Sequence, residues 1–358
     1  MQTKMKMQTK IRFLAAIACL AIGLLVARLS AQPVADGRLL VLSKADQMLA
    51  IVDPTTLKVI GRVPSGPDPH EVAASADGRT AYISNYGAGK GGFNTLTVAD
   101  LVKLTSRPPV DLGPLRGPHG MASAGGKIYF TAEVAKVIGR VDPATNKVDW
   151  AVGTGRDISH MVVVSNDLQR IYTVDVQSAT ASIIERAKGR GGRFAPAPDD
   201  DWTVTSVVVG DASENFEGFD VSPDGRELWT ASPRGKIAIV DPVGKKLLQT
   251  IDAPGVSGAN RLKFTPDGTR VLISRLSAPA GSAPGNIVVY DARTRNEIKR
   301  IDAGGGVGGL LMQPDGGRAF GSSRTGVVVI DLRTLETVGR IDAGGNPDGL
   351  AWAKTPQG

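Results

Sequence analysis

The hydrophobic positions of this chain fall in short runs, separated by turns rich in glycine, proline and aspartate. Typical runs are Ile287-Val288-Val289-Tyr290 and Val327-Val328-Val329-Ile330, which are β-branched and aromatic. Apolar residues do not recur at the spacing of an amphipathic helix, and runs of this length and composition are typical of buried strands. Beyond an apolar segment near the N-terminus, the pattern predicts strands throughout and no helix.

The runs belong to a repeating unit. In each unit an apolar strand ends in an acid, a short turn and a second strand follow, and a Gly- or Pro-rich link leads to two further strands. Seven units share 327 residues, about 47 residues each, which matches the length of a four-stranded propeller blade. The strand-ending acids are Asp53, Asp100, Asp142, Glu185, Asp241, Asp291 and Asp331.

A second recurring feature is a Pro-Asp-Gly turn later in the unit. It occurs at residues 222–225, 265–268 and 313–316, with a shortened form at residues 76–78. Proline presets a backbone φ suited to turns and glycine accepts a positive φ, so the tetrad predicts a hairpin. Its carboxylates are therefore interpreted as turn formers.

The segment Tyr82-Ile83-Ser84-Asn85, followed by Thr97-Val98-Ala99-Asp100 and combined with these turns, resembles the YVTN β-propeller repeat family. The resemblance covers residues 32–358 and implies an all-β, seven-bladed propeller with four-stranded antiparallel blades. Members of such a family share a fold and differ in function, so no activity follows from it. The last unit stops after Trp352, and residues 39–42 offer the missing strand. We therefore expect the N-terminal strand to close the ring.

The N-terminal segment has the three parts of a secretory signal. Basic residues precede an apolar stretch at residues 13–26, and Ser30-Ala31 offers a small-residue cleavage point. The stretch is shorter than the roughly 20 residues that span a bilayer. We predict a signal peptide at residues 1–31, a mature domain at residues 32–358 without a transmembrane span, and a periplasmic or secreted location.

Removing this segment changes what charge and cysteine content imply. Five positive charges and no acid lie in residues 1–31, so the formal net charge falls from +7 to about +2. Nucleic-acid binding needs a concentrated basic surface, and none is expected here. Cys19 is the only cysteine, so the mature chain is predicted to have no disulfide, no cysteine-bound metal and no covalently attached haem.

The three histidines of the chain occupy one position of the repeat, at the predicted start of the innermost strand. In a propeller this position surrounds the mouth of the central channel. Six of the seven residues can bind a metal or a proton. In order along the chain they are His70, His119, His160, Glu217, Asn260, Gly308 and Asp348.

Two interpretations of the histidines remain open. Three imidazoles and one carboxylate, from His70, His119, His160 and Glu217, suit zinc, copper, iron or nickel with positions free for water or substrate. Alternatively, one ancestral Pro-His-Gly turn was duplicated, and the histidines align without binding a metal. A wide arc of three blades also has to bring the ring nitrogens within metal-bonding distance of one ion.

A second ring is predicted on the same face, at the residues that end the strand before each rim loop. Among these, Arg275 is a candidate partner for an anionic ligand, for Asp348 or for Glu217. The ligand site at the channel mouth is therefore predicted to comprise His70, His119, His160, Glu217, Asn260, Asp348 and Arg275. The second ring comprises Asn85, Ala132, Asp175, Ser232, Arg275, Ser323 and Lys44.

Two functions follow. The first is a monomeric exported scaffold that binds a protein, a glycan or a small molecule at the channel mouth. The alternative is a metal-dependent enzyme of the lactonase, lyase or oxidase type with its centre on the axial histidines. A binding surface would distribute distinctive residues all around one face, whereas an enzyme would concentrate them, as the histidines of units one to three do.

Overall fold

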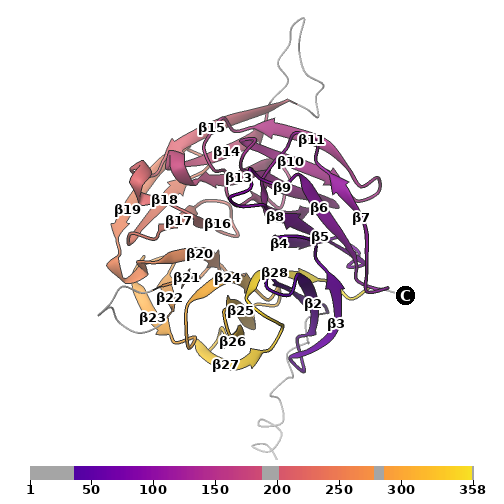
Figure 1. Ribbon diagram of the computed structural model, residues 1–358. Helices are drawn as coiled ribbons and strands as arrows, with labels where there is room; N and C mark the ends of the chain where they lie inside the picture. The colour runs from indigo at the N-terminus through magenta and orange to yellow at the C-terminus, as the bar shows by residue number, and fades with distance from the viewer. Residues whose placement is uncertain (1–35, 188–200, 278–285, 357–358) are drawn as a thin grey trace, which may run out of the picture. The chain divides into compact units, whose positions relative to one another are not determined.

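The computed structural model describes residues 36–187, 201–277 and 286–356, which form seven four-stranded antiparallel sheets. The sheets are arranged around a common axis as the blades of a β-propeller (Figure 1). This confirms the predicted fold class. In each blade the first strand given below is the one next to the axis.

The first four blades follow one another along the chain. Blade 1 is β4 (Pro69–Ala74), β5 (Thr80–Asn85), β6 (Thr95–Asp100) and β7 (Thr105–Asp111). Blade 2 is β8 (Pro118–Ala124), β9 (Lys127–Ala132), β10 (Val137–Asp142) and β11 (Lys147–Gly153). Blade 3 is β12 (Val163–Val164), β13 (Arg170–Asp175), β14 (Thr180–Arg186) and β15 (Trp202–Val208). Blade 4 is β16 (Gly218–Val221), β17 (Leu228–Ser232), β18 (Lys236–Asp241) and β19 (Lys246–Asp252).

The remaining blades complete the ring. Blade 5 is β20 (Ala259–Phe264), β21 (Arg270–Arg275), β22 (Ile287–Asp291) and β23 (Glu297–Ile301). Blade 6 is β24 (Val307–Met312), β25 (Arg318–Ser323), β26 (Gly326–Asp331) and β27 (Glu336–Ile341). Blade 7 joins the two ends of the domain, with β28 (Pro347–Ala353), β1 (Arg38–Ser43), β2 (Met48–Asp53) and β3 (Lys58–Pro64).

The closing blade confirms the predicted role of the N-terminal strand. β1 pairs antiparallel with β28, with Leu39 opposite Trp352 and Leu40 opposite Ala351. On its other edge β1 pairs with β2. The inner strand of blade 7 therefore comes from the C-terminal end, and its other three strands come from the N-terminal end. The edges of β1 and β28 that face each other are paired and do not remain open.

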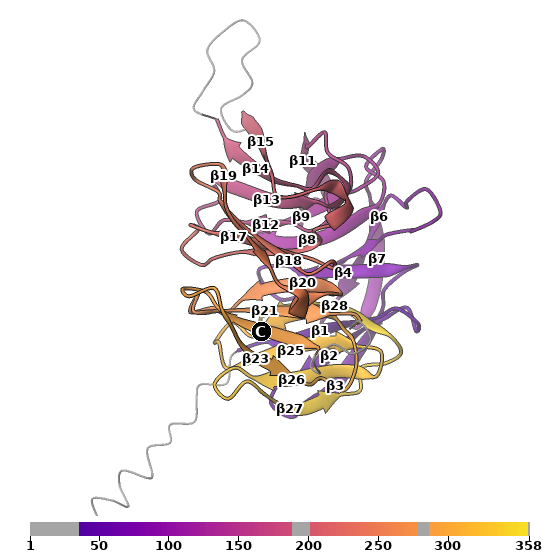
Figure 2. The ribbon, with the colours of Figure 1, turned by 90° about the vertical axis from the view of Figure 1, so that its left-hand side faces the viewer.

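The hydrophobic runs are continuous because each blade is covered on both faces by its two neighbouring blades. Along β22, Ile287 and Val289 pack in a cluster with blade 6, while Val288 and Tyr290 pack in a cluster with blade 4. Successive side chains of a strand point to opposite faces, so alternate residues enter alternate interfaces. The edge-on view shows the neighbouring sheets stacked in this way (Figure 2).

The acid at the end of the third strand has a clear local role. The Oδ1 atom of Asp53 accepts hydrogen bonds from the backbone N–H groups of Thr55 at 2.8 Å and Thr56 at 3.2 Å. The turn then places Leu57 in the left-handed region at φ 59°. The carboxylate offsets the conformational cost of this turn by satisfying its amides. Equivalent bonds are made by Asp100, Asp142, Asp241, Asp291 and Asp331.

Only short 3₁₀ turns interrupt the strands in the described ranges. They are η1 (Val176–Ser178), η2 (Ala212–Glu214) and η3 (Pro254–Val256). No helix within these ranges has the length and hydrophobicity needed to cross a bilayer. The predicted signal peptide at residues 1–31 lies outside the described residues.

Candidate channel-mouth site

A β-bulge in the inner strand directs pairs of consecutive residues toward the axis. In blade 1, two residues of β4, His70 and Glu71, lie opposite one residue of β5, Ser84. The same two-against-one register occurs in blades 2, 5, 6 and 7. A bulge of this kind interrupts the ladder and re-aims side chains. It therefore gives each of these blades two consecutive channel positions.

The bulge leaves a backbone N–H without a ladder partner, and a hydroxyl on the second strand satisfies it. The Oγ atom of Ser84 accepts from the Glu71 N–H at 2.9 Å. This bond explains why the Tyr82–Asn85 motif and its equivalents in blades 2, 5 and 6 carry serine or threonine at this position. The corresponding bonds are Gly120 to Thr131 (2.8 Å), Arg261 to Ser274 (3.0 Å) and Gly309 to Ser322 (2.6 Å).

Glycine occupies the second bulge position in blades 2, 6 and 7, where the next blade approaches closely. A Cβ atom on Gly349 would lie 2.4 Å from the carbonyl oxygen of His70. A Cβ atom on Gly309 would lie 2.5 Å from the carbonyl oxygen of Asp348. No side chain fits at such distances, so glycine permits the inner strands to pack backbone against backbone. Glu71 and Arg261 are the charged exceptions in this layer.

In the five bulged blades, the first bulge position holds the residue that the sequence aligned. His70, His119, Asn260, Gly308 and Asp348 lie in β4, β8, β20, β24 and β28. His160 and Glu217 lie just before β12 and β16. The ring is therefore occupied by three histidines in blades 1 to 3, by Glu217 and Asn260 in blades 4 and 5, by the bare backbone of Gly308 in blade 6, and by Asp348 in blade 7.

The three histidines form a continuous stack. The ring centroid of His119 lies 4.5 Å from that of His70 and 4.0 Å from that of His160. Tyr86 packs edge-on against both His70 and His119, with centroids 4.9 Å apart in each case. The imidazoles of three adjacent blades thus do converge, which answers the geometric question left by the sequence.

His70 is held by groups from blade 7 and the following loop. Its Nδ1 atom lies 2.8 Å from a carboxylate oxygen of Asp348. The Lys44 ammonium lies 3.1 Å from Nε2 and 3.4 Å from the same Asp348 oxygen. Since an ammonium can only donate, this arrangement favours the tautomer with the proton on Nδ1. Both ring nitrogens of His70 are therefore engaged.

His160 lies between two carboxylates. Its Nδ1 atom is 2.6 Å from Oε1 of Glu133, and its Nε2 atom is 3.1 Å from Oε1 of Glu217. Burial lowers the pKa of this imidazole, but hydrogen bonds to the two carboxylates outweigh burial and raise the pKa to about 8. The Tyr86 hydroxyl donates to the other oxygen of Glu133. Burial and this bond to Glu133 raise the pKa of Tyr86.

A buried ion pair crosses the channel beneath the histidines. The Arg261 guanidinium from blade 5 donates to Oε1 of Glu71 in blade 1 at 2.8 Å and to Oε1 of Glu217 at 3.3 Å. Asn260 also donates to Glu217, at 2.8 Å. Although burial alone would lower it, the carboxylates raise the pKa of Arg261. Arg261 and Glu71 therefore span the channel under the site.

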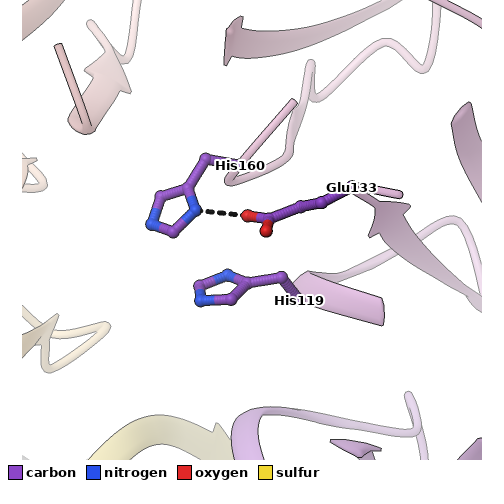
Figure 3. Close-up of side chains that lie close together, drawn as sticks. All are labelled: His119, Glu133 and His160. Carbon is purple, nitrogen blue, oxygen red and sulfur yellow. Dashed lines mark hydrogen bonds and ion pairs between the residues drawn. The ribbon is translucent and has the colours of Figure 1, made fainter. Parts of the chain in front are cut away.

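His119 differs from its neighbours because its Nδ1 atom is buried without a hydrogen-bond partner in the described chain. Burial, followed by the nearby positive charges, lowers the pKa of His119 well below its ordinary value, so the ring is neutral. One ligand atom each of His119, Glu133 and His160 lie within 4.8 Å of one another. Figure 3 shows the three side chains converging.

This cluster differs from the set expected from the sequence. Glu133 joins His119 and His160, while His70 is occupied by Asp348 and Lys44, and Glu217 lies on the far nitrogen of His160. Two imidazoles and a carboxylate are a donor set that suits zinc, iron, copper or nickel. The buried, unpartnered nitrogen of His119 is what such an ion would satisfy.

Sequence reasoning missed Glu133 and Tyr86 by one residue. The second strands end at Ser43, Asn85 and Ala132, and the next residue in each case is Lys44, Tyr86 or Glu133. These following residues contact the histidines. Lys44, counted as a strand end in the sequence, belongs to this later position. Extending the count past each strand end by one would have found them.

Arg275 lies at the end of β21 with its side chain fully buried. Its Nε–H donates to the carbonyl oxygen of Ser257 at 2.8 Å. Burial lowers its pKa, and the charges that act on it are those of Arg300 and Glu297 in the outer part of the same blade. The structure thus brings the other predicted residues together around the axis and places Arg275 within blade 5.

Fold and site together define a seven-bladed propeller with a histidine–carboxylate cluster at the mouth of its channel. No protein-family model matches the sequence, and no curated protein resembles it at the sequence level. Solved structures share the fold at low identity. A functionally unknown protein from Desulfotomaculum acetoxidans has 12% identity and a TM-score of 0.69, covering 88% of this chain and 99% of its own.

Two further structures are similar. A candidate 6-phosphogluconolactonase from Bacteroides uniformis has 15% identity and a TM-score of 0.66, covering 89% of this chain and 99% of its own. Hydrazine synthase from Kuenenia stuttgartiensis has 15% identity and a TM-score of 0.62, covering 80% and 95%. At these identities the comparison establishes the propeller fold, and proteins with unrelated chemistry share it.

Proposed function

We propose that this protein binds a small ligand at the mouth of its central channel through a transition-metal ion held by His119, His160 and Glu133. The observation that carries the proposal is the buried Nδ1 atom of His119, which has no hydrogen-bond partner in the described chain. A buried polar atom without a partner costs about 1–3 kcal/mol, and a bound ion would remove that cost.

The protonation state of His119 supports metal binding. The pKa of His119 is lowered by burial, so its ring is in the neutral form that coordinates metals. His160, whose pKa is raised to about 8, would have to lose the proton on the ring nitrogen that binds the ion. Tyr86, which donates to Glu133, would orient that carboxylate as an outer-sphere partner.

Three protein ligands favour a site that acts on a ligand over one that only stabilises the fold. Structural zinc sites are usually closed by four protein ligands, whereas catalytic sites keep a position for water or substrate. A metal-dependent enzyme is therefore the second candidate, in which a bound ion would polarise a substrate and Tyr86 would handle a proton. The asymmetric grouping of the histidines in blades 1 to 3 favours this alternative.

The cellular setting belongs to the same proposal. Export by a signal peptide at residues 1–31, a mature propeller at residues 32–358 that acts as a monomer in the periplasm or medium, and membership of the YVTN-repeat family all derive from the sequence pattern. Mass spectrometry of the mature N-terminus tests the cleavage directly.

The proposed metal site is tested by elemental analysis of protein purified without chelator. We expect about one equivalent of a transition metal in the wild type and a loss of it in His119→Ala and in Glu133→Gln. His70→Ala is the matched control, because His70 lies outside the cluster of His119, Glu133 and His160, and it should keep the metal.

Circular dichroism establishes that each variant is folded. A wild type that takes up no zinc, copper, iron or nickel from added salts would rule out the metal site. Equal loss of metal in His70→Ala would instead favour the wider set of His70, His119, His160 and Glu217.

A further inference from the structure

A cavity of about 690 Å³ opens on the channel-mouth face beside the ring. It is lined by Lys44 and Asp348, the two residues that hold His70, and it extends over blades 5 to 7. Its lining is mostly polar or without side chains, with the hydroxyls of Ser322 and Ser323 and the glycines of residues 304–306.

The cavity meets the ring where the ring has no side chain. Gly308 lines it, and in the six other blades the same position holds histidine, glutamate, asparagine or aspartate. Around the ring, blade 2 is three blades from blade 6 in one direction, and blade 3 is three blades from it in the other direction (Figure 1). The empty position therefore lies across the channel mouth from His119 and His160.

The charges of the cavity favour an anion. Lys44 and Arg324 line it, and Asp348 is its only acidic lining residue. Asp348 is already paired with His70 at 2.8 Å, and its pKa is lowered because this pairing outweighs burial. The Arg324 guanidinium has no hydrogen-bond or ion-pair partner among the described residues, and its side chain is exposed at the cavity edge.

Arg340 adds a third cation behind the residues that line the cavity. Its guanidinium donates to the hydroxyls of Ser323 and Thr325 at 3.2 Å and 3.0 Å. Both residues line the cavity. Unlike Arg340, Arg324 has a guanidinium that is free to bind a ligand. Such a group binds carboxylates or phosphates in a charge-assisted, bidentate geometry.

We infer that the cavity beside Gly308 is a subsite for the anionic end of a small polyhydroxylated organic acid, which Arg324 and Lys44 bind. Hydroxyls and exposed backbone suit a hydroxylated ligand better than an apolar one. The orientation of the ligand, with its other end toward His119 and His160, rests on the proposed metal site. Binding in the cavity does not.

The test uses isothermal titration calorimetry with matched probes on the mature protein. Threonate and ribonate carry a carboxylate, and threitol and ribitol are their neutral counterparts. We expect the acids to bind and the neutral polyols to bind at least tenfold more weakly. Arg324→Gln should weaken binding of the acids about tenfold, because one charge-assisted bond is lost.

Two variants make the result specific. Arg333→Gln removes an equally exposed charge from the opposite end of the same blade and should leave binding unchanged. Gly308→Met places a side chain in the part of the cavity next to the ring. A Cβ atom there meets its nearest neighbours at 3.5 Å or more, so the fold and the metal content should be retained while binding of the acids is lost.

The outcomes separate the two proposals. Binding of acids that depends on Arg324 and Gly308 but occurs in metal-free protein supports the subsite even if the metal site fails. Equal binding of acids and polyols, no binding of either, or an equal effect of Arg333→Gln would overturn the subsite whatever the metal content.

Discussion

Two sides of the same ring contrast at the channel mouth. On the histidine side, in blades 1 to 3, the ring position holds imidazoles that stack on one another, and those of His70 and His160 pair with carboxylates. On the glycine side, in blade 6, the equivalent position of Gly308 is bare and borders a cavity. Blades 1, 2 and 6 present this position with the same backbone bulge. The fold thus provides the position, and the side chain alone decides whether it becomes a cluster or an opening.

The largest effect is expected where the two halves of the ring are tied together. Arg261→Met leaves Glu71 buried without its partner, and breaking a buried ion pair costs about 3–5 kcal/mol. Urea denaturation should show this loss in the free energy of unfolding. Adding Glu71→Gln to Arg261→Met should recover part of it, and a single variant as stable as the wild type would contradict the role of this pair.

Next in size is a matched pair of glycine substitutions. Gly349→Ala places a Cβ atom 2.4 Å from the His70 carbonyl oxygen and should cost about 1–3 kcal/mol by overpacking. Gly308→Ala meets only ordinary contacts and should change stability by less than about 0.5 kcal/mol. Thermal unfolding of the two variants side by side checks this. Similar losses of stability would show that the position of Gly308 does not have room for a side chain.

The histidine side should also give the metal-free protein a distinctive pH dependence. The pKa of His160 is raised to about 8 in the folded state, compared with about 6.5 for a free imidazole. Its protonation therefore stabilises the fold fully below about pH 6.5, and up to about 2 kcal/mol is lost as the pH rises through 8. Denaturation in chelator at several pH values measures this fall. In His160→Gln it should be absent, and an unchanged pH profile would refute the assignment.

The smallest effect concerns a residue that contacts the proposed ligands without belonging to them. Tyr86→Phe removes the hydroxyl that orients Glu133 and should lower metal affinity about tenfold in competition with a chelating dye. Tyr82→Phe is the control, because its hydroxyl binds Asn146 at 2.6 Å. If both variants bind metal equally well, Tyr86 serves only to pack against the histidines.

The sequence predicted the architecture because each blade repeats the same local chemistry. Asp53, which caps the turn that follows it, and the glycine of each Pro-Asp-Gly turn meet requirements set by neighbours only a few residues away. The ring closure by residues 39–42 followed from counting strands. Such features depend on local backbone requirements, so a repeat makes them visible without knowledge of the tertiary structure.

The site was only partly visible for the opposite reason. The alignment of the histidines gave the first bulge position, but the sequence does not show that a bulge turns Glu71 and Arg261 toward the axis as well. Nor does it show that Glu133 reaches back from a rim loop to His160. These contacts join residues up to 190 positions apart, and side-chain direction decides them.

The pairing of β1 with β28 has a consequence for the order of assembly. Arg38 and Ala353 are paired partners, yet almost the whole domain separates them along the chain. The inner strand of the closing blade is thus the last strand of the domain to be synthesised, and until then its place between the inner strands β4 and β24 is empty. Contacts of such long range slow folding. Completion of the ring, and with it the contact between His70 and Asp348, is therefore a late step in the folding of each molecule.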